Sequence, residues 1–171
     1  MLIPLPYDAS PKQRIAQYES LKVRLMALLE GERDEVALYA TVACELHHSF
    51  EAFHWTGFYR VTAPRLLTVG PYQGGHGCLR IPFDRGVCGA AARSGETQRV
   101  GDVRLLPHHI ACSSSTRSEL VVPVRNSYGE IISVLDIDSD HENYFLDEDQ
   151  ACIEALCETF SVKFLHVSLK G

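Results

Sequence analysis

Apolar residues recur at helical spacing near both ends of the chain. Ser10-Pro11 offers a capping serine with proline at the first helical position, and leucines repeat from there until Gly31. A second helical pattern covers residues 34–50. Near the other end, Asp147 and Gln150 have the spacing of a capping box and precede a further apolar stripe. The pattern therefore predicts two helices at the beginning of the chain and one at its end.

The middle of the chain has the short apolar runs and turn residues of β-strands. We expect strands at residues 54–61, 66–72, 78–83, 97–100, 120–124 and 131–137. An alanine-rich segment at 86–94 predicts a short helix, and residues 101–117 predict a long loop or lid. Because helices and strands do not alternate along the chain, the predicted fold class is α+β, an antiparallel β-sheet flanked by N- and C-terminal helices.

Composition narrows the class of protein. The chain has 171 residues, of which 46% are hydrophobic and 22% charged, as is typical of one globular domain. Its net charge of −6 argues against binding to a phosphate backbone, which favours a basic surface. No run approaches the about 18 apolar residues of a membrane span, and the N-terminus lacks the basic start of a signal peptide. We therefore expect a cytoplasmic protein.

The cysteines divide into two groups. Three fall in helical patterns, where a free cysteine serves as a small apolar residue: Cys44, Cys152 and Cys157. The other three lie in the central segments, near turn glycines or in the expected lid: Cys78, Cys88 and Cys112. A cytoplasmic setting keeps thiols reduced, so any disulfide among the second group would be transient and catalytic.

Acidic residues interrupt an apolar strand that follows these cysteines. Asp136 and Asp138 are two positions apart in a predicted strand, so both side chains lie on one face. Burying unpaired charges is costly, so the two carboxylates need a polar cavity, a strand end or water. An edge strand with a solvated acidic face is the alternative interpretation. Glu119 opens the neighbouring strand and either faces the same cavity or forms a surface ion pair with Arg117.

Thiols and carboxyl groups together can reduce a sulfoxide. A carboxyl group in a partly apolar cavity has a raised pKa and can donate a proton near neutral pH. A thiolate can attack sulfur while the departing oxygen takes that proton, which leaves a cysteine sulfenic acid. A second thiol condenses with the sulfenic acid to a disulfide, and an external dithiol reduces it. The three central cysteines supply an attacking thiol, a resolving thiol and one more.

An aromatic segment offers an apolar wall for such a cavity. Trp55, the only tryptophan, shares a strand face with Gly57 and Tyr59. An indole beside a cavity can pack a methyl-sulfur group, and ordinary core packing is the alternative.

Several strings occur together in a diagnostic order: Trp55-Thr56-Gly57-Phe58-Tyr59, Gly70-Pro71-Tyr72-Gln73-Gly74, Arg80-Ile81-Pro82-Phe83, Gly86-Val87-Cys88-Gly89, His109-Ile110-Ala111-Cys112, Ser118-Glu119-Leu120-Val121-Val122-Pro123 and Leu135-Asp136-Ile137-Asp138-Ser139. With them, the chain resembles the free methionine-(R)-sulfoxide reductases, which are GAF-domain proteins, over roughly residues 34–165. All three family cysteines are present, ten and twenty-four residues apart. The resemblance implies a GAF-like catalytic domain at residues 34–171, with residues 1–33 forming an N-terminal arm and helix that pack on it.

The resemblance also implies the reaction and the residues that perform it. The substrate would be free L-methionine-(R)-S-oxide, reduced to L-methionine. Cys112 would attack, and Cys78 would resolve the sulfenic acid as a disulfide that thioredoxin reopens. Cys88 is the third family cysteine, and an assignment with Cys88 as the attacker stays open. The other implied residues hold the sulfoxide oxygen and the ammonium, or line the methyl pocket: Glu119, Asp136, Asp138, Trp55 and Tyr59.

Further implications concern partners and alternatives. The resemblance implies a homodimer that acts in oxidative stress, with no cofactor except external thioredoxin, ultimately supplied by NADPH, and no metal, nucleic acid or membrane. Two positions depart from the family pattern, Ser113 where an acid is usual and His108 where a glycine is usual, and both lie in the expected lid. Two alternatives remain, a GAF domain that senses a small molecule without catalysis and a zinc site built from the three cysteines with His108 or His109.

Overall fold

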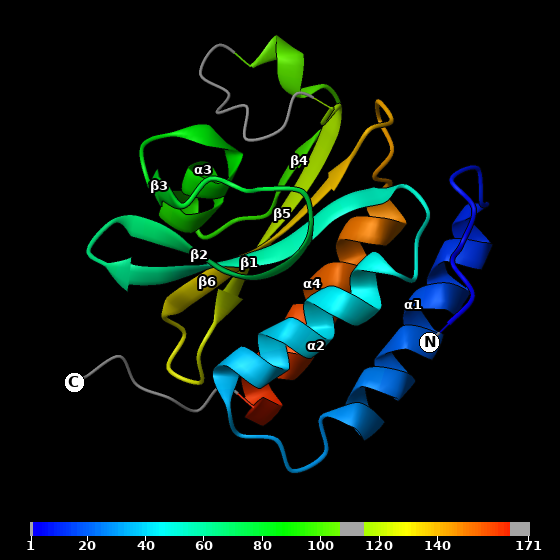
Figure 1. Cartoon of the computed structure of the whole chain (residues 1–171), viewed down its shortest axis with the longest axis horizontal. Helices are drawn as coiled ribbons and strands as arrows, with labels where there is room; N and C mark the ends of the chain where they lie inside the picture. Colours follow the sequence, from blue (N-terminus) through cyan, green and yellow to red (C-terminus); the bar gives the residue numbers. More distant parts are fainter. Residues whose placement is uncertain (1, 107–114, 165–171) are drawn as a thin grey trace.

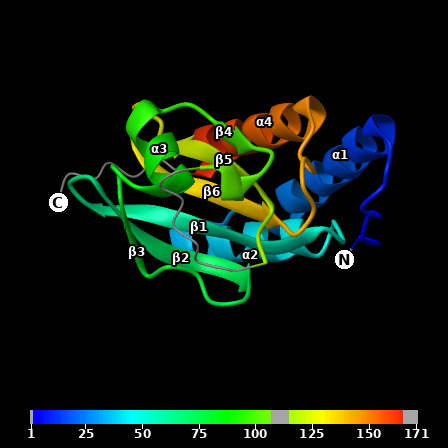
Figure 2. The same ribbon diagram turned by 90° about the horizontal axis from the view of Figure 1, so that it is seen from above.

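The structure is a computed structural model that describes residues 2–106 and 115–164. Its framework is a six-stranded sheet in which every pairing is antiparallel. The strands are β1 (Phe53–Ala63), β2 (Leu66–Gly74), β3 (Arg80–Pro82), β4 (Gln98–Val100), β5 (Ser118–Arg125) and β6 (Ile131–Ser139). Figure 2 shows their spatial order, β3-β2-β1-β6-β5-β4. Because β6 lies between β1 and β5, the alternative that its aspartates belong to a solvated edge strand is wrong.

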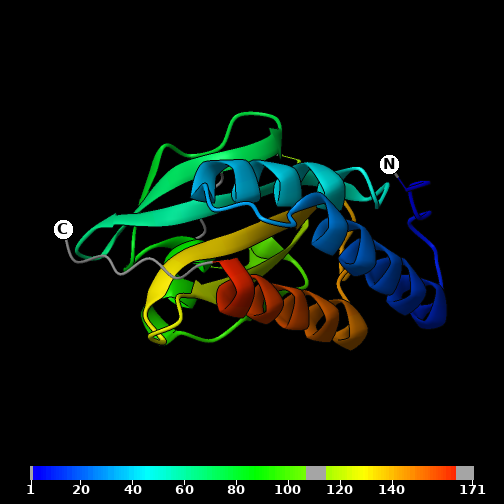
Figure 3. The ribbon, with the colours of Figure 1, turned by 90° about the horizontal axis from the view of Figure 1, so that it is seen from below.

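Helices cover both faces of the sheet, but unequally. One face carries α1 (Pro11–Leu28), α2 (Glu35–His47) and α4 (Asp147–Phe164), which lie on the same side in Figure 3. Of these, α2 packs on β1 and β2, α4 packs on β5, and α1 contacts α2 and α4. The opposite face carries the short helix α3 (Gly86–Ser94), as Figure 1 shows. The predicted α+β fold class, an antiparallel sheet flanked by N- and C-terminal helices, is confirmed.

Alternation along the strands sends side chains into two separate cores. On β5, Leu120 and Val122 enter the core beneath α1, α2 and α4, whereas Val121 enters the core beneath α3. The core beneath α3 also contains Trp55 and Cys88. Four of the predicted site residues that the structure describes, Trp55, Tyr59, Cys78 and Cys88, therefore lie in or against the smaller core beneath α3.

The local signals for helix ends are confirmed in two places. The side chain of Ser10 accepts a hydrogen bond from the backbone N–H of Gln13, and the Gln13 side chain returns the contact, so α1 begins with a capping box. Gly95 ends α3 with φ of +72°, a left-handed conformation that glycine adopts without a side-chain clash. Among the described helices, none is long and apolar enough to cross a membrane.

The region between β2 and α3 differs from the prediction. The strand expected at residues 78–83 is limited to Arg80–Pro82, which pairs with the start of β2. Proline has no N–H to extend the ladder, and Cys78 falls in the connection that precedes the strand. The expected lid begins with a 3₁₀ turn at Val103–Leu105. Most of the rest of the expected lid, including Cys112, lies outside the described residues.

Candidate active site

Two central strands carry the three predicted acidic residues on the face that α3 covers. On β6, Asp136 lies between Leu135 and Ile137, whose side chains enter the opposite core. Glu119 on β5 pairs with Asp138 across the ladder, and directly opposite residues project to the same face. The prediction that the two aspartates share a face is confirmed. Glu119 is 5% exposed, so its interpretation as a surface ion pair is wrong.

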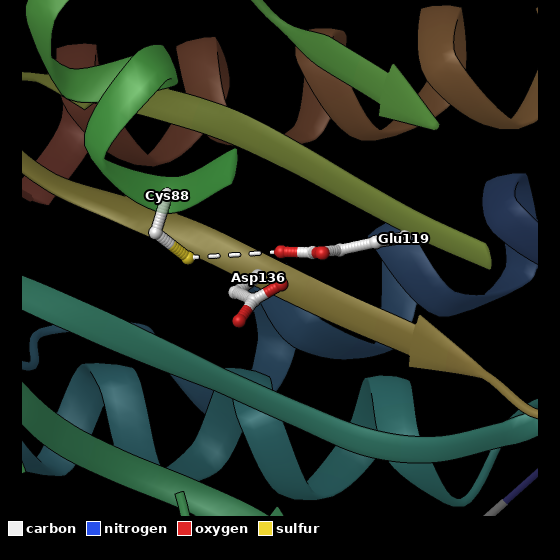
Figure 4. A group of neighbouring side chains, drawn as sticks. All are labelled: Cys88, Glu119 and Asp136. Carbon is white, nitrogen blue, oxygen red and sulfur yellow. Dashed lines mark hydrogen bonds between the residues drawn. The ribbon is translucent and has the colours of Figure 1, made fainter. Parts of the chain in front are cut away.

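Cys88 reaches the same acids from the helix above the sheet. Its side chain is 3% exposed, and its Sγ atom lies 4.0 Å from Oε1 of Glu119. Figure 4 shows the Cys88 thiol and the two carboxyl groups of Glu119 and Asp136 converging from α3, β5 and β6. Gly89 permits this approach, since a Cβ there would lie 2.5 Å from the carbonyl oxygen of Pro82. The structure thus brings one of the three predicted cysteines together with the predicted acids.

Burial raises the pKa of every acid in this cluster. For Glu119 the pKa is well above its ordinary value because of burial first, and then because of the charges of Asp136 and Asp138. Burial also raises the pKa of Asp136, to about 7, although hydrogen bonds with Cys88 and Glu119 limit the rise. Burial followed by the charge of Asp136 raises the pKa of Asp138. Among the described residues, no arginine or lysine contributes to these shifts, so protons occupy the cluster near neutral pH.

The same environment keeps the Cys88 thiol neutral. Burial raises its pKa well above the ordinary value, and the charges of Asp136 and Glu119 raise it further. Because the thiolate is the nucleophile, a buried thiol beside acids is a poor attacking group. This favours Cys112 over Cys88 as the attacker, an assignment that stays a prediction because Cys112 lies outside the described residues.

Three aromatic rings form a stack beside the acids. Trp55 pairs with Asp138 across the ladder, so its indole lies on the same sheet face. Its ring lies 5.6 Å from that of Tyr59 and 5.3 Å from that of Tyr72, both nearly parallel to it. The indole N–H donates to the carbonyl oxygen of Gly75, which fixes the ring plane. Trp55 and Tyr59 share one strand face, as predicted, while Tyr72 was quoted only within a motif and not as a site residue.

The connection that carries Cys78 passes directly against this stack. A Cβ on Gly77 would lie 2.8 Å from the Tyr59 hydroxyl and 3.0 Å from the Trp55 ring, so only glycine fits there without a shift. Cys78 is half-buried and packs against the core beneath α3. The predicted resolving cysteine therefore lies beside the aromatic wall of the candidate site.

Sequence reasoning missed a polar contact at the far end of the site. The Thr116 hydroxyl hydrogen-bonds to Asp138, which partly offsets the rise in the pKa of that carboxyl group. The same hydroxyl lies 3.3 Å from Nε2 of His54. The sequence placed Thr116 in the expected lid and His54 at the start of a predicted strand, and neither was assigned to the site. The only available signal was that His54 lies next to Trp55 at the start of a strand.

The raised pKa of Asp136 makes stability depend on pH in a defined direction. Between its ordinary pKa of 3.8 and the folded value of about 7, the native state holds a proton that the unfolded chain has lost. Each pH unit in that window lowers the free energy of unfolding by up to about 1.4 kcal/mol. We expect Asp136→Asn to reduce the dependence of the free energy of unfolding on pH in this window. At pH above 7 the variant should be more stable than wild type by about 1–4 kcal/mol.

Urea unfolding at intervals between about pH 5 and about pH 8 measures this effect. Asp84→Asn, at an exposed position between β3 and α3, is the matched control and should keep the wild-type slope. An Asp136→Asn variant whose stability falls with pH as steeply as wild type would contradict a proton held by this carboxyl group.

Comparison with known proteins adds independent information. The GAF domain family matches residues 23–164. A free methionine-R-sulfoxide reductase of Escherichia coli is 39% identical over 163 residues, which cover 90% of this chain and 96% of that protein. The X-ray structure of free methionine-R-sulfoxide reductase from Neisseria meningitidis in complex with its substrate is 40% identical, with a TM-score of 0.84 over 95% of this chain and 96% of that one. A putative GAF sensor protein from Burkholderia vietnamiensis is 39% identical, with a TM-score of 0.84 over 91% of this chain and 96% of that one.

Proposed function

Since this chain belongs to the GAF domain family and, within it, to the free methionine-(R)-sulfoxide reductases, we propose that it reduces free L-methionine-(R)-S-oxide to L-methionine. The homologues support an oxidoreductase of this kind. The residue roles, the disulfide chemistry and the reductant described below are our proposal.

The observation that carries the proposal is a set of buried acids, with pKa values raised by that burial, beside an aromatic wall. Burial first, and then the charges of Asp136 and Asp138, raise the pKa of Glu119, and burial raises the pKa of Asp136 to about 7, so the two carboxyl groups can share one charge and one proton near neutral pH. A carboxylate suits the ammonium group of a free amino acid, and a protonated carboxyl suits a sulfoxide oxygen. We assign Asp136 and Asp138 to the ammonium, Glu119 to the oxygen, and Trp55 with Tyr59 to the methyl-sulfur end.

The first chemical step would be attack of the Cys112 thiolate on the sulfoxide sulfur. Glu119 gives its proton to the sulfoxide oxygen, because an unprotonated oxygen would develop too much negative charge. The hydroxyl group then transfers to the cysteine sulfur, and methionine leaves with the electron pair on its thioether sulfur. The cysteine loses two electrons and becomes a sulfenic acid, and the sulfoxide gains these two electrons and becomes a thioether.

The second step regenerates the enzyme. The Cys78 thiol would attack the sulfenic sulfur, forming a disulfide, while the hydroxyl group leaves as water with the thiol proton. An external dithiol protein, for which we propose thioredoxin, then supplies two electrons and two protons to restore both thiols. Cys78 is half-buried and followed by Leu79, which is 69% exposed, so a protein reductant can approach this connection. A homodimer stays part of the proposal.

A sensor without catalysis is the second candidate, and the similarity to a putative GAF sensor protein favours it. The site argues against an anionic nucleotide, because it offers carboxyl groups and, among the described residues, no arginine or lysine that contributes to their pKa values and could pair with a phosphate. A neutral or cationic small molecule remains compatible with such a sensor.

A coupled assay separates the two functions. We expect consumption of NADPH in the presence of thioredoxin and thioredoxin reductase when the free R epimer is added. A peptide-bound sulfoxide should react at least about tenfold more slowly, since a site that pairs buried groups with the ammonium rejects substrates without it. The free S epimer should also react at least about tenfold more slowly, because with its ammonium and methyl-sulfur end held in the same places its oxygen would not point at Glu119. Binding of the R epimer without consumption of any dithiol would favour the sensor.

A further inference from the structure

The cluster of Cys88, Glu119 and Asp136 has the composition of a site for a thiophilic cation. One potential ligand atom from each residue lies within 4.8 Å of the other two, and all three side chains are buried. A tetrahedral Zn²⁺ has bonds of about 2.3 Å to sulfur and about 2.0–2.2 Å to carboxylate oxygen, which spaces its ligands about 3.3–3.8 Å apart. Movements of about 1 Å or less would therefore bring these atoms into coordination distance.

An unsatisfied oxygen provides a second, independent observation. Asp136 is 6% exposed, and its Oδ1 atom has no hydrogen-bond partner within the part of the chain that the structure describes. In Figure 4, one oxygen of its carboxyl group turns toward the gap between Cys88 and Glu119, and the other turns away from that gap. A buried acceptor without a partner is costly, and a cation that draws this carboxyl group into coordination would satisfy it.

The ligand chemistry of the cluster also suits a cation. Protons neutralise the acids while the site is empty, and burial keeps the Cys88 thiol protonated as well. A divalent cation can replace those protons, since deprotonated thiol and carboxyl groups are its ligands. The sulfur ligand selects Zn²⁺ or Cd²⁺ over Mg²⁺ and Ca²⁺, which prefer oxygen ligands alone.

We propose that Cys88, Glu119 and Asp136 form a reversible inhibitory site for a thiophilic divalent cation of the Zn²⁺ and Cd²⁺ class. Inhibition rests on the proposed reductase function, because the cation would occupy the carboxyl groups that hold the sulfoxide amino acid. Binding of the cation does not rest on it. This site differs from the three-cysteine zinc site considered from the sequence, as it uses one cysteine and two carboxyl groups.

Cadmium binding to a chain without the other central cysteines tests the site directly. In the full-length Cys78→Ser/Cys112→Ser variant, Cd²⁺ should produce a thiolate-to-cadmium charge-transfer band at one equivalent. Adding Cys88→Ser should abolish the band or weaken binding by more than about tenfold. Cys152→Ser, which removes a half-buried thiol of α4 instead, is the matched control and should leave both band and affinity intact. A band that survives Cys88→Ser, or that disappears with Cys152→Ser, overturns the proposal.

Two further readouts separate the site from adventitious binding and from the reductase proposal. Affinity for Cd²⁺ should rise about tenfold per pH unit for each proton released, and excess Mg²⁺ should not compete. In the active wild-type protein, Zn²⁺ should inhibit competitively with the sulfoxide, reversibly on chelation. Cadmium binding without any turnover would contradict only the proposed reductase function. The proposed inhibitory site would be contradicted by an affinity that does not depend on pH, by displacement of the cation by Mg²⁺, or by noncompetitive inhibition.

Discussion

Replacing Cys112 with serine should lower turnover of free methionine sulfoxide by at least about 10³-fold, because removal of a covalent nucleophile leaves only binding and electrostatic effects. The hydroxyl of serine has nearly the same size as the thiol, so the fold should be unaffected. Single-turnover reduction of the sulfoxide by the prereduced protein, without added reductant, measures the attack itself. Circular dichroism spectra and urea midpoints of wild type and variant should coincide.

Cys88→Ser is the matched control for this experiment. Cys88 is 3% exposed, and burial beside Asp136 and Glu119 holds the pKa of its thiol well above the ordinary value. At neutral pH only a small fraction of such a thiol is ionised to the thiolate that could attack. We expect Cys88→Ser to retain turnover within about tenfold of wild type, as is usual for the loss of one hydrogen bond. If Cys88→Ser is inactive and Cys112→Ser is active, the two roles are reversed.

The alternation of apolar and polar residues was sufficient to predict which side chains share a face of each strand. Alternation placed Asp136 and Asp138 on one side of β6 and Leu135 and Ile137 on the other, and the structure has this arrangement. Strand period depends only on local backbone geometry, so it is readable from one segment at a time. The same reasoning placed Trp55 and Tyr59 on one strand face, and in the structure both lie in the core beneath α3.

The same reasoning could not predict the register between paired strands or the order of the strands in the sheet. Whether Asp138 faces Trp55 on one side and Glu119 on the other depends on pairings between segments distant in the sequence. Apolar alternation limits those pairings but does not choose among them. An edge position for β6 therefore stayed open until the sheet order excluded it. The role of Cys112 is a matter of resemblance throughout, since the described residues do not include it.

A buried ion pair is a second feature that local sequence patterns do not predict. Asp149 lies between Asp147 and Gln150, at the start of the last predicted helix, where acids are common and usually solvated. In the structure it is fully buried, and its carboxylate accepts hydrogen bonds from Arg14 at 2.7 Å and from the Tyr18 hydroxyl at 2.9 Å. Arg14 is 4% exposed and also lies over the ring of Tyr144. These contacts fasten α1 to the beginning of α4.

We expect Asp149→Ala to lower the free energy of unfolding by about 3–5 kcal/mol, since it leaves the buried Arg14 guanidinium without its counter-charge. Asp147→Ala is the matched control, because Asp147 has an 88% exposed side chain paired with Arg99, and exposed pairs contribute about 0–1 kcal/mol. Urea unfolding at neutral pH measures both. The double variant Arg14→Met/Asp149→Leu should recover much of the loss, because apolar side chains can replace a buried pair. If Asp149→Ala costs no more than Asp147→Ala, the pair does not hold α1 on the domain.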